Sequence, residues 1–259
     1  MAKVYAILSG KGGVGKTTSA INIATSLSYL GEDVIVVDGN LTTPNIGIHL
    51  GAPIVPVTLN HVLNNQAKLE DAIYEHESGT KIIPASLSLK EYEKINYRKL
   101  IDIAKKLKKI TEYVLIDASA GLGEEARAAM YASDEIIIVT NPELSAVTDA
   151  LKTIKLAEEI GKPVKGVIIN RYRKSKADMK ISDIRDMLEV PILGIIPEDE
   201  SVKKSQLIKN PVVCTHPRSP SSKQYISTSK RILGEKIEFE EDEEGFFSKL
   251  LKSLGIRKV

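Results

Sequence analysis

A glycine-rich segment near the N-terminus constrains the fold of this chain more than any other feature. Residues 9–18 read SGKGGVGKTT. An apolar run at residues 4–8 precedes them and predicts a buried strand, and apolar residues at helical spacing follow over residues 17–30. A glycine, four residues, a second glycine, lysine and threonine between a strand and a helix form the phosphate-binding loop pattern.

The chemistry of phosphate binding explains these residue types. Glycines let backbone N–H groups turn toward phosphate oxygens, and a helix N-terminus favours an anion. We expect Lys16 to reach the terminal phosphates and the Thr17 hydroxyl to ligate Mg²⁺. Nucleotide contacts are predicted along the whole loop, at Gly10, Lys11, Gly12, Gly13, Val14, Gly15, Lys16, Thr17 and Thr18.

Strand-like and helical runs alternate along the rest of the chain. Strands are predicted at 4–8, 34–37, 81–84, 113–116, 135–140, 164–170 and 192–196. Helices are predicted at 17–30, 97–108, 124–131, 145–160, 181–188, 201–208 and 221–233, with two short ones near 59–63 and 69–73. Strands that are apolar on both faces predict an α/β, doubly wound, mostly parallel sheet with helices on both faces and ligands at the carboxyl ends of the strands.

Composition narrows the class of protein. With 259 residues, 42% of them hydrophobic and 27% charged, the chain predicts a soluble globular protein with one large domain over residues 1–236. The net charge of +2 is too small to indicate nucleic-acid binding from overall charge. Cys214 is the only cysteine, which excludes intrachain disulfides and paired-cysteine metal sites. No apolar run approaches the roughly 18 residues of a membrane span, and no signal peptide is evident, so we expect a cytoplasmic location.

Lys11 adds a second cation inside the loop, which one nucleotide in one subunit does not need. The sequence KGGVGKTT at residues 11–18 resembles the deviant Walker A loop of the MinD/ParA family of dimerising ATPases. The resemblance covers about residues 3–255 and implies a P-loop NTPase fold, ATP and Mg²⁺ as ligands, and an ATP-dependent homodimer. It also implies catalytic roles for Lys16 and Lys11, with Lys11 reaching the nucleotide of the partner subunit.

Two acidic residues follow predicted strands. Asp38 ends the second strand, where it is placed to hold the water shell of a metal ion. Asp117 follows four apolar residues, as in a Walker B strand, and is expected near Thr17 and Mg²⁺; capping of the next helix is the structural alternative. The family's switch loops correspond to Asn45 and to Ala120 with Gly121, and Ser119 occupies the position of a family proline.

Position 40 departs from the family. The family pattern after the second strand is Asp-x-Asp, whose second aspartate positions the attacking water, whereas this chain has Asn40. An amide cannot accept a proton, so weak or blocked hydrolysis is expected. Three interpretations stay open: a naturally slow ATPase, an engineered change that traps the ATP-bound dimer, and a neutral loop residue.

The resemblance also implies residues that contact the base and the partner subunit. Asn170 matches the asparagine that reads the adenine edge, and Arg171 follows it. The loop expected to close over the base contains Pro197, Glu198 and Asp199. Glu143 and Asp149 lie in a stretch similar to the dimer face of the family, although acids at a helix N-terminus explain both almost as well.

The C-terminal segment changes character. Residues 237–245 are mostly acidic and predict a flexible linker. Residues 246–259 predict an amphipathic helix that targets an anionic membrane reversibly; a helix docked on the core is the alternative. Its apolar face contains Phe246, Phe247, Leu250, Leu251 and Leu254, and its cationic side contains Lys249 and Lys252.

These features predict an ATPase that moves reversibly between the cytoplasm and the inner face of the cell membrane and positions cell machinery with a protein partner still to be identified. The alternative function is a ParA-like partition protein whose ATP dimer binds DNA non-specifically through the basic runs 105–109 and 171–176. Solvated helix or loop faces are the favoured explanation of both basic runs. A scaffold ATPase for metal or cofactor maturation is disfavoured because paired cysteines are missing.

Overall fold

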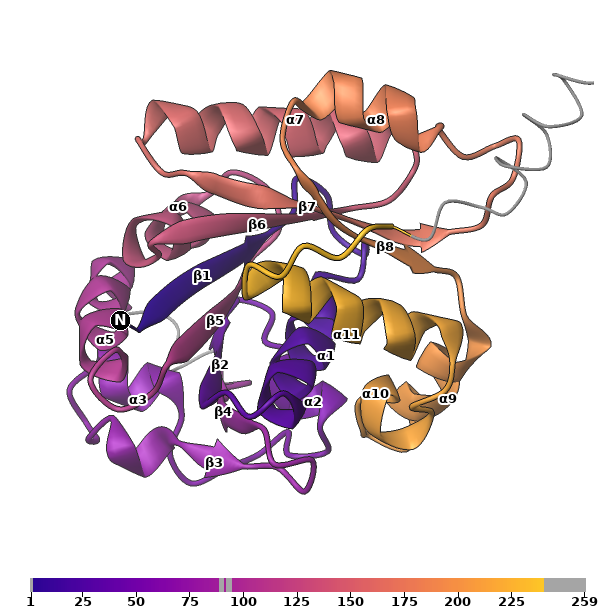
Figure 1. Ribbon diagram of the computed structural model, residues 1–259. Helices are drawn as coiled ribbons and strands as arrows, with labels where there is room; N and C mark the ends of the chain where they lie inside the picture. Colours follow the sequence, from indigo (N-terminus) through magenta and orange to yellow (C-terminus); the bar gives the residue numbers. More distant parts are fainter. Residues whose placement is uncertain (1, 89–90, 92–94, 240–259) are drawn as a thin grey trace, which may run out of the picture.

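The computed structural model describes residues 2–88, 91 and 95–239. Within them, eight strands form one sheet in the order β3-β4-β2-β5-β1-β6-β7-β8 (Figure 1). Neighbouring strands are parallel except for β3, which is antiparallel to β4. The strands are β1 (Lys3–Leu8), β2 (Val34–Gly39), β3 (Tyr74–Glu75), β4 (Lys81–Ile83), β5 (Tyr113–Ala118), β6 (Glu135–Thr140), β7 (Val164–Tyr172) and β8 (Ile192–Pro197).

Helices cover both faces of this sheet. They are α1 (Lys16–Tyr29), α2 (Ile46–His49), α3 (Leu59–Leu63), α5 (Leu100–Leu107), α6 (Glu124–Ala132), α7 (Leu144–Glu159), α8 (Ile181–Leu188), α9 (Glu200–Leu207), α10 (Val212–Thr215) and α11 (Pro220–Ile232). Two 3₁₀ turns, η1 (Glu70–Ala72) and η2 (Tyr97–Lys99), join them. In Figure 1, α1 and α11 lie on one side of the sheet and α7 and α8 on the other.

The central strand β1 shows why both faces are covered. Val4, Ala6 and Leu8 belong to a buried cluster that includes residues of α5, α6, α7 and α8. Tyr5 and Ile7 belong to a second cluster with residues of α1, α10 and α11. Because successive side chains of a strand point to opposite faces, a strand that is apolar throughout must be buried on both. The predicted doubly wound α/β fold is confirmed.

The sheet order sets the position of the site. The strand β1 lies between β5 and β6. The strands β2 to β5 lie on one side of β1, and the strands β6 to β8 lie on the other. In such a sheet the ligand crevice lies at the carboxyl ends of the strands where the order reverses. The loops after β1, β2 and β5 therefore meet at one edge.

The short elements differ most from the sequence prediction. The predicted helix at 97–108 is a 3₁₀ turn, η2, followed by α5. The strand β3 and the helices α2 and α10 were not predicted, because two to four residues are too few to show a period. The two short helices predicted near 59–63 and 69–73 correspond to α3 and η1.

Arg231 contacts residues 237–239, the last that the structure describes. Its Nε donates to the Ile237 carbonyl at 2.9 Å and its Nη2 to the Glu238 carbonyl at 3.2 Å. Its guanidinium lies 3.9 Å from the ring centre of Phe239, and its Nη1 donates to Leu193 in β8 at 3.1 Å. Residues 237–239, the start of the predicted linker, are therefore bound to the domain.

The predicted amphipathic helix at 246–259 lies outside the described residues. Over the part of the chain that is described, no helix has the length and apolar character needed to cross a membrane.

Candidate functional site: a phosphate-binding loop beside two buried carboxylates

The loop between β1 and α1 has a backbone that only glycine fits at two positions. Gly15 has φ +90°, and a Cβ there would lie 2.2 Å from Nδ2 of Asn170. A Cβ on Gly10 would lie 2.2 Å from the backbone oxygen of Asp149. The loop is thus pressed against β7 on one side and α7 on the other, while α1 begins directly after Gly15.

A cavity of about 950 Å³ opens above this loop. Such a volume is typical of small-molecule and cofactor sites. The predicted residues that line it are Gly12, Gly13, Gly15, Lys16, Thr17, Thr18, Asn40, Asn45, Ala120 and Arg171. Lining residues that were not predicted are Ser9, Thr42, Thr43, His49, Tyr97, Ser119, Gly123, Glu124, Glu125 and Gln206.

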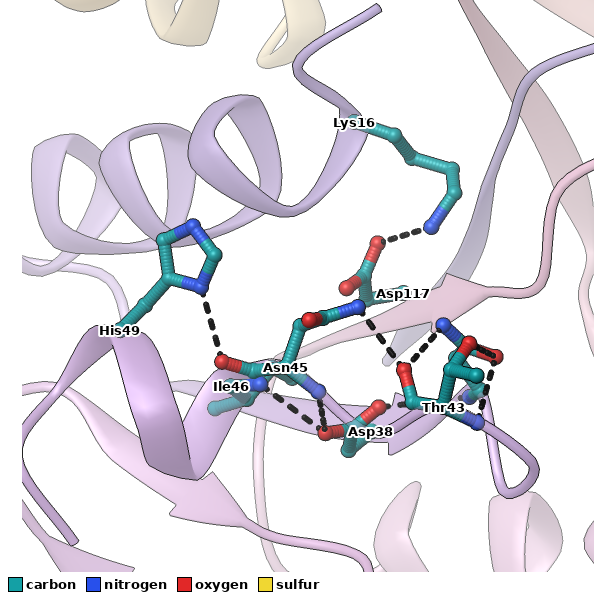
Figure 2. Close-up of polar contacts among 8 residues, drawn as sticks. Lys16, Asp38, Thr43, Asn45, Ile46, His49 and Asp117 are labelled. Atoms are coloured by element: carbon teal, nitrogen blue, oxygen red, sulfur yellow. Dashed lines mark hydrogen bonds and ion pairs between the residues drawn. The ribbon is translucent and has the colours of Figure 1, made fainter. Parts of the chain in front are cut away.

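Two carboxylates lie side by side at the carboxyl ends of β2 and β5, and neither lines the cavity itself. Asp38 and Asp117 are register partners on β2 and β5, and both are fully buried. Asp117 Oδ1 accepts a hydrogen bond from Lys16 Nζ at 2.7 Å. Asp38 Oδ2 accepts from the backbone N–H groups of Asn45 at 2.9 Å and Ile46 at 3.0 Å (Figure 2).

The second oxygen of Asp117 marks where a cation fits. Asp117 Oδ2 is buried and has no hydrogen-bond partner among the described residues. Thr17, which is also buried, lines the adjoining cavity. Mg²⁺ is held in proteins by one or two carboxylates, with waters and phosphate oxygens completing its shell. Thr17, Asp38 and Asp117 therefore fit Mg²⁺, although the described residues contain no group of three or more His, Cys, Asp or Glu that would hold a metal alone.

Both ends of the Asn40 amide form hydrogen bonds within the loop after β2. Its Nδ2 donates to the Thr43 carbonyl at 2.6 Å, and its Oδ1 accepts from Thr43 Oγ1 at 3.1 Å. Asn45 Nδ2 donates to the same Thr43 carbonyl at 2.8 Å. These bonds fasten the loop after β2 in the way an Asx turn does. Asn40 therefore has a structural role here, whatever its part in the chemistry.

The loop after β5 approaches the phosphate-binding loop. The backbone N–H of Gly121 donates to the Ser9 carbonyl at 2.9 Å, with Gly121 at φ +84°. Ala120 lines the cavity, whereas Gly121 does not. The two predicted switch segments, around Asn45 and Ala120, are thus brought to one cavity.

Asn170 lies beneath the phosphate-binding loop. Its Nδ2 donates to the Val14 carbonyl at 2.7 Å. With its amide nitrogen turned toward the loop, Asn141 donates to the Val14 and Asn170 carbonyls at 3.1 and 3.2 Å. Two asparagines thus support one loop carbonyl, a role that the sequence did not predict. Base reading by Asn170 stays a prediction.

The loop predicted to close over the base has structural contacts of its own. Partial burial raises the pKa of Asp199, but hydrogen bonds from Ser221 and Ser201 outweigh it and lower that pKa to about 2. Asp199 caps α9 by accepting from the Ser201 N–H at 2.8 Å. Glu198 lies 3.7 Å from Arg173, and neither acid nor Pro197 lines the cavity. Their contact with a base stays a prediction.

The predicted interface residues cluster on one side of the loop. Lys11 Nζ lies 3.7 Å from Glu143 Oε2, and both side chains are about half exposed. Asp149, whose backbone contacts Gly10, pairs with Lys152 at 3.1 Å. Lys11, Glu143 and Asp149 are therefore neighbours, at the start of α7.

Asp38 predicts a pH-dependent stability. Burial, and next the charge of Asp117, raise its pKa from 3.8 to about 7. The folded state therefore binds this proton more tightly than the unfolded state, and the stabilisation is lost as the pH rises from about 4 to about 7. We expect Asp38→Asn, which needs no proton, to raise the Tm of the nucleotide-free protein by about 2–4 °C at pH 7.5.

Thermal unfolding at several pH values, followed by circular dichroism, checks this prediction. The difference in Tm between Asp38→Asn and the unaltered protein should shrink as the pH falls toward 4. A difference that stays constant over this range would show that ionisation of Asp38 is not its cause.

Comparisons with known proteins agree with this geometry. The AAA domain family matches residues 2–166. An uncharacterized ATP-binding protein of Methanocaldococcus jannaschii is 37% identical over 260 residues, covering 100% of this chain and 98% of that protein. The septum site-determining protein MinD of Escherichia coli K12 is 32% identical over 272 residues, covering 96% of this chain and 99% of its own.

Solved structures show the same relationship. MinD of Pyrococcus horikoshii, complexed with Mg-ADP, superimposes with a TM-score of 0.86 at 37% identity, covering 92% of this chain and 100% of its own. MinD in the MinC:MinD complex of Aquifex aeolicus has a TM-score of 0.85 at 32% identity, covering 93% and 99%. On the shared loop, sheet order and sequence, this chain belongs to the MinD/ParA family of P-loop ATPases.

Proposed function

We propose that this protein is an ATPase that dimerises on binding Mg-ATP, then attaches to the inner face of the cell membrane and positions cell machinery. The position of Lys11 is the observation that carries this proposal. Lys16 lines the cavity, whereas Lys11, five residues earlier in the same loop, does not. A cation that belongs to a phosphate-binding loop but lies outside its own cavity is available to the nucleotide of a second subunit.

The contact between Lys11 and Glu143 leaves Lys11 free to move. An ion pair at 3.7 Å between two half-exposed side chains contributes little to stability, typically about 0–1 kcal/mol. Exchange of Glu143 for a phosphate of the partner subunit would replace this weak pair by a stronger one, since phosphate carries more charge. The dimer face would then include Lys11, Glu143 and Asp149.

The relatives support a spatial role. The Escherichia coli protein is named for septum-site determination, and the Aquifex aeolicus structure is a cell-division complex of MinD with MinC. Division-site placement is therefore the first process to test here, with a protein partner that remains to be identified.

The C-terminal segment supplies the membrane contact in this proposal. Its sequence alternates apolar residues such as Phe247 and Leu251 with Lys249 and Lys252, which suits anionic lipids. One such segment binds weakly, but two on one dimer bind far better, since the second binding event is intramolecular. ATP-driven dimerisation would then act as a membrane switch.

Co-sedimentation with anionic vesicles tests the proposal. We expect the full chain to pellet in Mg-ATP and to stay in the supernatant in Mg-ADP. A version that ends at Glu244 should not pellet in either nucleotide, because it lacks the amphipathic segment. Lys11→Ala should bind Mg-ATP, measured by calorimetry, yet should neither dimerise nor pellet.

Vesicles without anionic lipid are the control in this experiment. If the full chain and the truncated version pellet equally in Mg-ATP and in Mg-ADP, the proposed membrane switch loses its basis. In that case, salt-sensitive binding of the ATP form to random duplex DNA would instead support the partition function. Among the described residues, the basic run at 105–109 is partly neutralised, since Lys108 pairs with Asp134 at 3.0 Å.

Turnover is proposed to be slow because of Asn40. Its amide is committed to Thr43 and cannot accept the proton of an attacking water. We expect Asn40→Asp to raise the rate of phosphate release by about tenfold or more, below the usual range of a general base because the loop was not shaped around an acid. An unchanged rate in Asn40→Asp would show that position 40 does not limit hydrolysis.

A further inference from the structure

We propose that Glu125 supplies the carboxylate that the loop after β2 lacks at position 40, and that it accepts the proton of the attacking water. This inference deepens the proposed function and rests on the protein hydrolysing ATP. The turnover that the chain retains with Asn40 then depends on Glu125. No sequence motif singled this residue out, because it lies in the first turn of α6, where acids are common.

Glu125 lies in the right cavity and is enclosed. The residue is 8% exposed, although glutamate is rarely buried unless it is paired. It lines the same cavity as Lys16, Asn40 and Thr42. A carboxylate buried in the cavity that is expected to hold the phosphates needs a chemical or structural reason.

The partner of Glu125 is a neutral hydroxyl. Its Oε1 accepts a hydrogen bond from Thr42 Oγ1. A hydroxyl occupies one acceptor position of the carboxylate, which leaves further lone pairs for a water molecule. Thr42 lies two residues after Asn40, so this bond places the Glu125 carboxylate at the loop where the family has its second aspartate.

The Asn40 side chain cannot accept the proton of the attacking water. Both ends of its amide are engaged by Thr43, at 2.6 Å for the donor and 3.1 Å for the acceptor. The loop therefore keeps its shape through neutral bonds, and the negative charge beside it comes from α6. Position 40 thus carries an amide where the family pattern has an acid.

The chemical step balances with water as the second substrate. The water oxygen forms a bond to the γ-phosphorus while the bond from that phosphorus to the β–γ bridging oxygen breaks. ADP leaves with the bonding electron pair, and the water proton passes to the Glu125 carboxylate, which later releases it to solvent.

A structural role for Glu125 makes different predictions. The bond between Glu125 and Thr42 also fastens the loop after β2 to α6, and a purely structural role would consist of this fastening alone. Glu125→Gln keeps an oxygen that accepts from the Thr42 hydroxyl but removes the proton acceptor. Thr42→Val removes the hydroxyl and keeps the carboxylate.

The experiment measures phosphate release at saturating Mg-ATP, together with ATP affinity by calorimetry. We expect Glu125→Gln to lower kcat by about tenfold or more, within the lower range of general-base effects, and to change ATP affinity by less than about threefold. Thr42→Val should lower kcat less than Glu125→Gln does, because it removes the hydroxyl that holds the carboxylate but keeps the proton acceptor. Glu159→Gln, an exposed acid at the end of α7, is the control for the substitution itself.

A double-mutant cycle with Asn40→Asp gives the sharper test. Once an aspartate is present at position 40, Glu125 is dispensable, so Glu125→Gln should lower kcat in that background by less than about threefold. A fastening role predicts the same fold loss in both backgrounds.

Three results would overturn the inference. They are an unchanged kcat in Glu125→Gln, an equal loss with and without Asn40→Asp, and an unaltered protein that binds Mg-ATP without any turnover. Failure of the unaltered protein to bind Mg-ATP would instead contradict the proposed function, so the two failures are distinguishable.

Discussion

The site depends on the burial of two carboxylates beside one lysine. The parallel register of β2 and β5 forces Asp38 and Asp117 next to each other, and burial would make two adjacent negative charges costly. Lys16 offsets one of them, and backbone N–H groups after β2 together with a raised pKa offset the other. The loops around the cavity take their shape from this charge balance. A bound cation would change the charge balance of both carboxylates at once.

Much of this arrangement is encoded locally, and for that reason the sequence predicts it. The phosphate-binding loop is one contiguous pattern, and strands that are apolar on both faces predict a covered parallel sheet. Asp38 and Asp117 follow such strands, so their meeting at one edge follows from the fold. The contact of Glu125 with Thr42, by contrast, joins the helix after β5 to the loop after β2. It depends on strand order and register, which no local pattern contains.

The asparagines show a second limit of sequence reasoning. A family resemblance assigns Asn170 to the base and leaves Asn40 without its acid, but it says nothing of which polar groups each amide meets. In the structure Asn170 supports the Val14 carbonyl, and Asn40 fastens its own loop through Thr43. Both amides satisfy buried backbone groups that would otherwise be costly to leave unpaired. Two loops of the cavity are therefore held in shape by neutral bonds, before any phosphate charge arrives.

Arg231 connects residues 237–239, the last that the structure describes, to the sheet. Its guanidinium donates hydrogen bonds to the carbonyls of Ile237 and Glu238 and lies over the ring of Phe239. It also donates to the carbonyl of Leu193 in β8. The origin of residues 240–259 is therefore a fixed point on the domain, not the end of α11. A pull on Phe239 would be borne first by this arginine and then by the edge strand β8, whose neighbour β7 contains Asn170 and Arg171. Tension applied at Phe239 would thus reach the strand that supports the phosphate-binding loop.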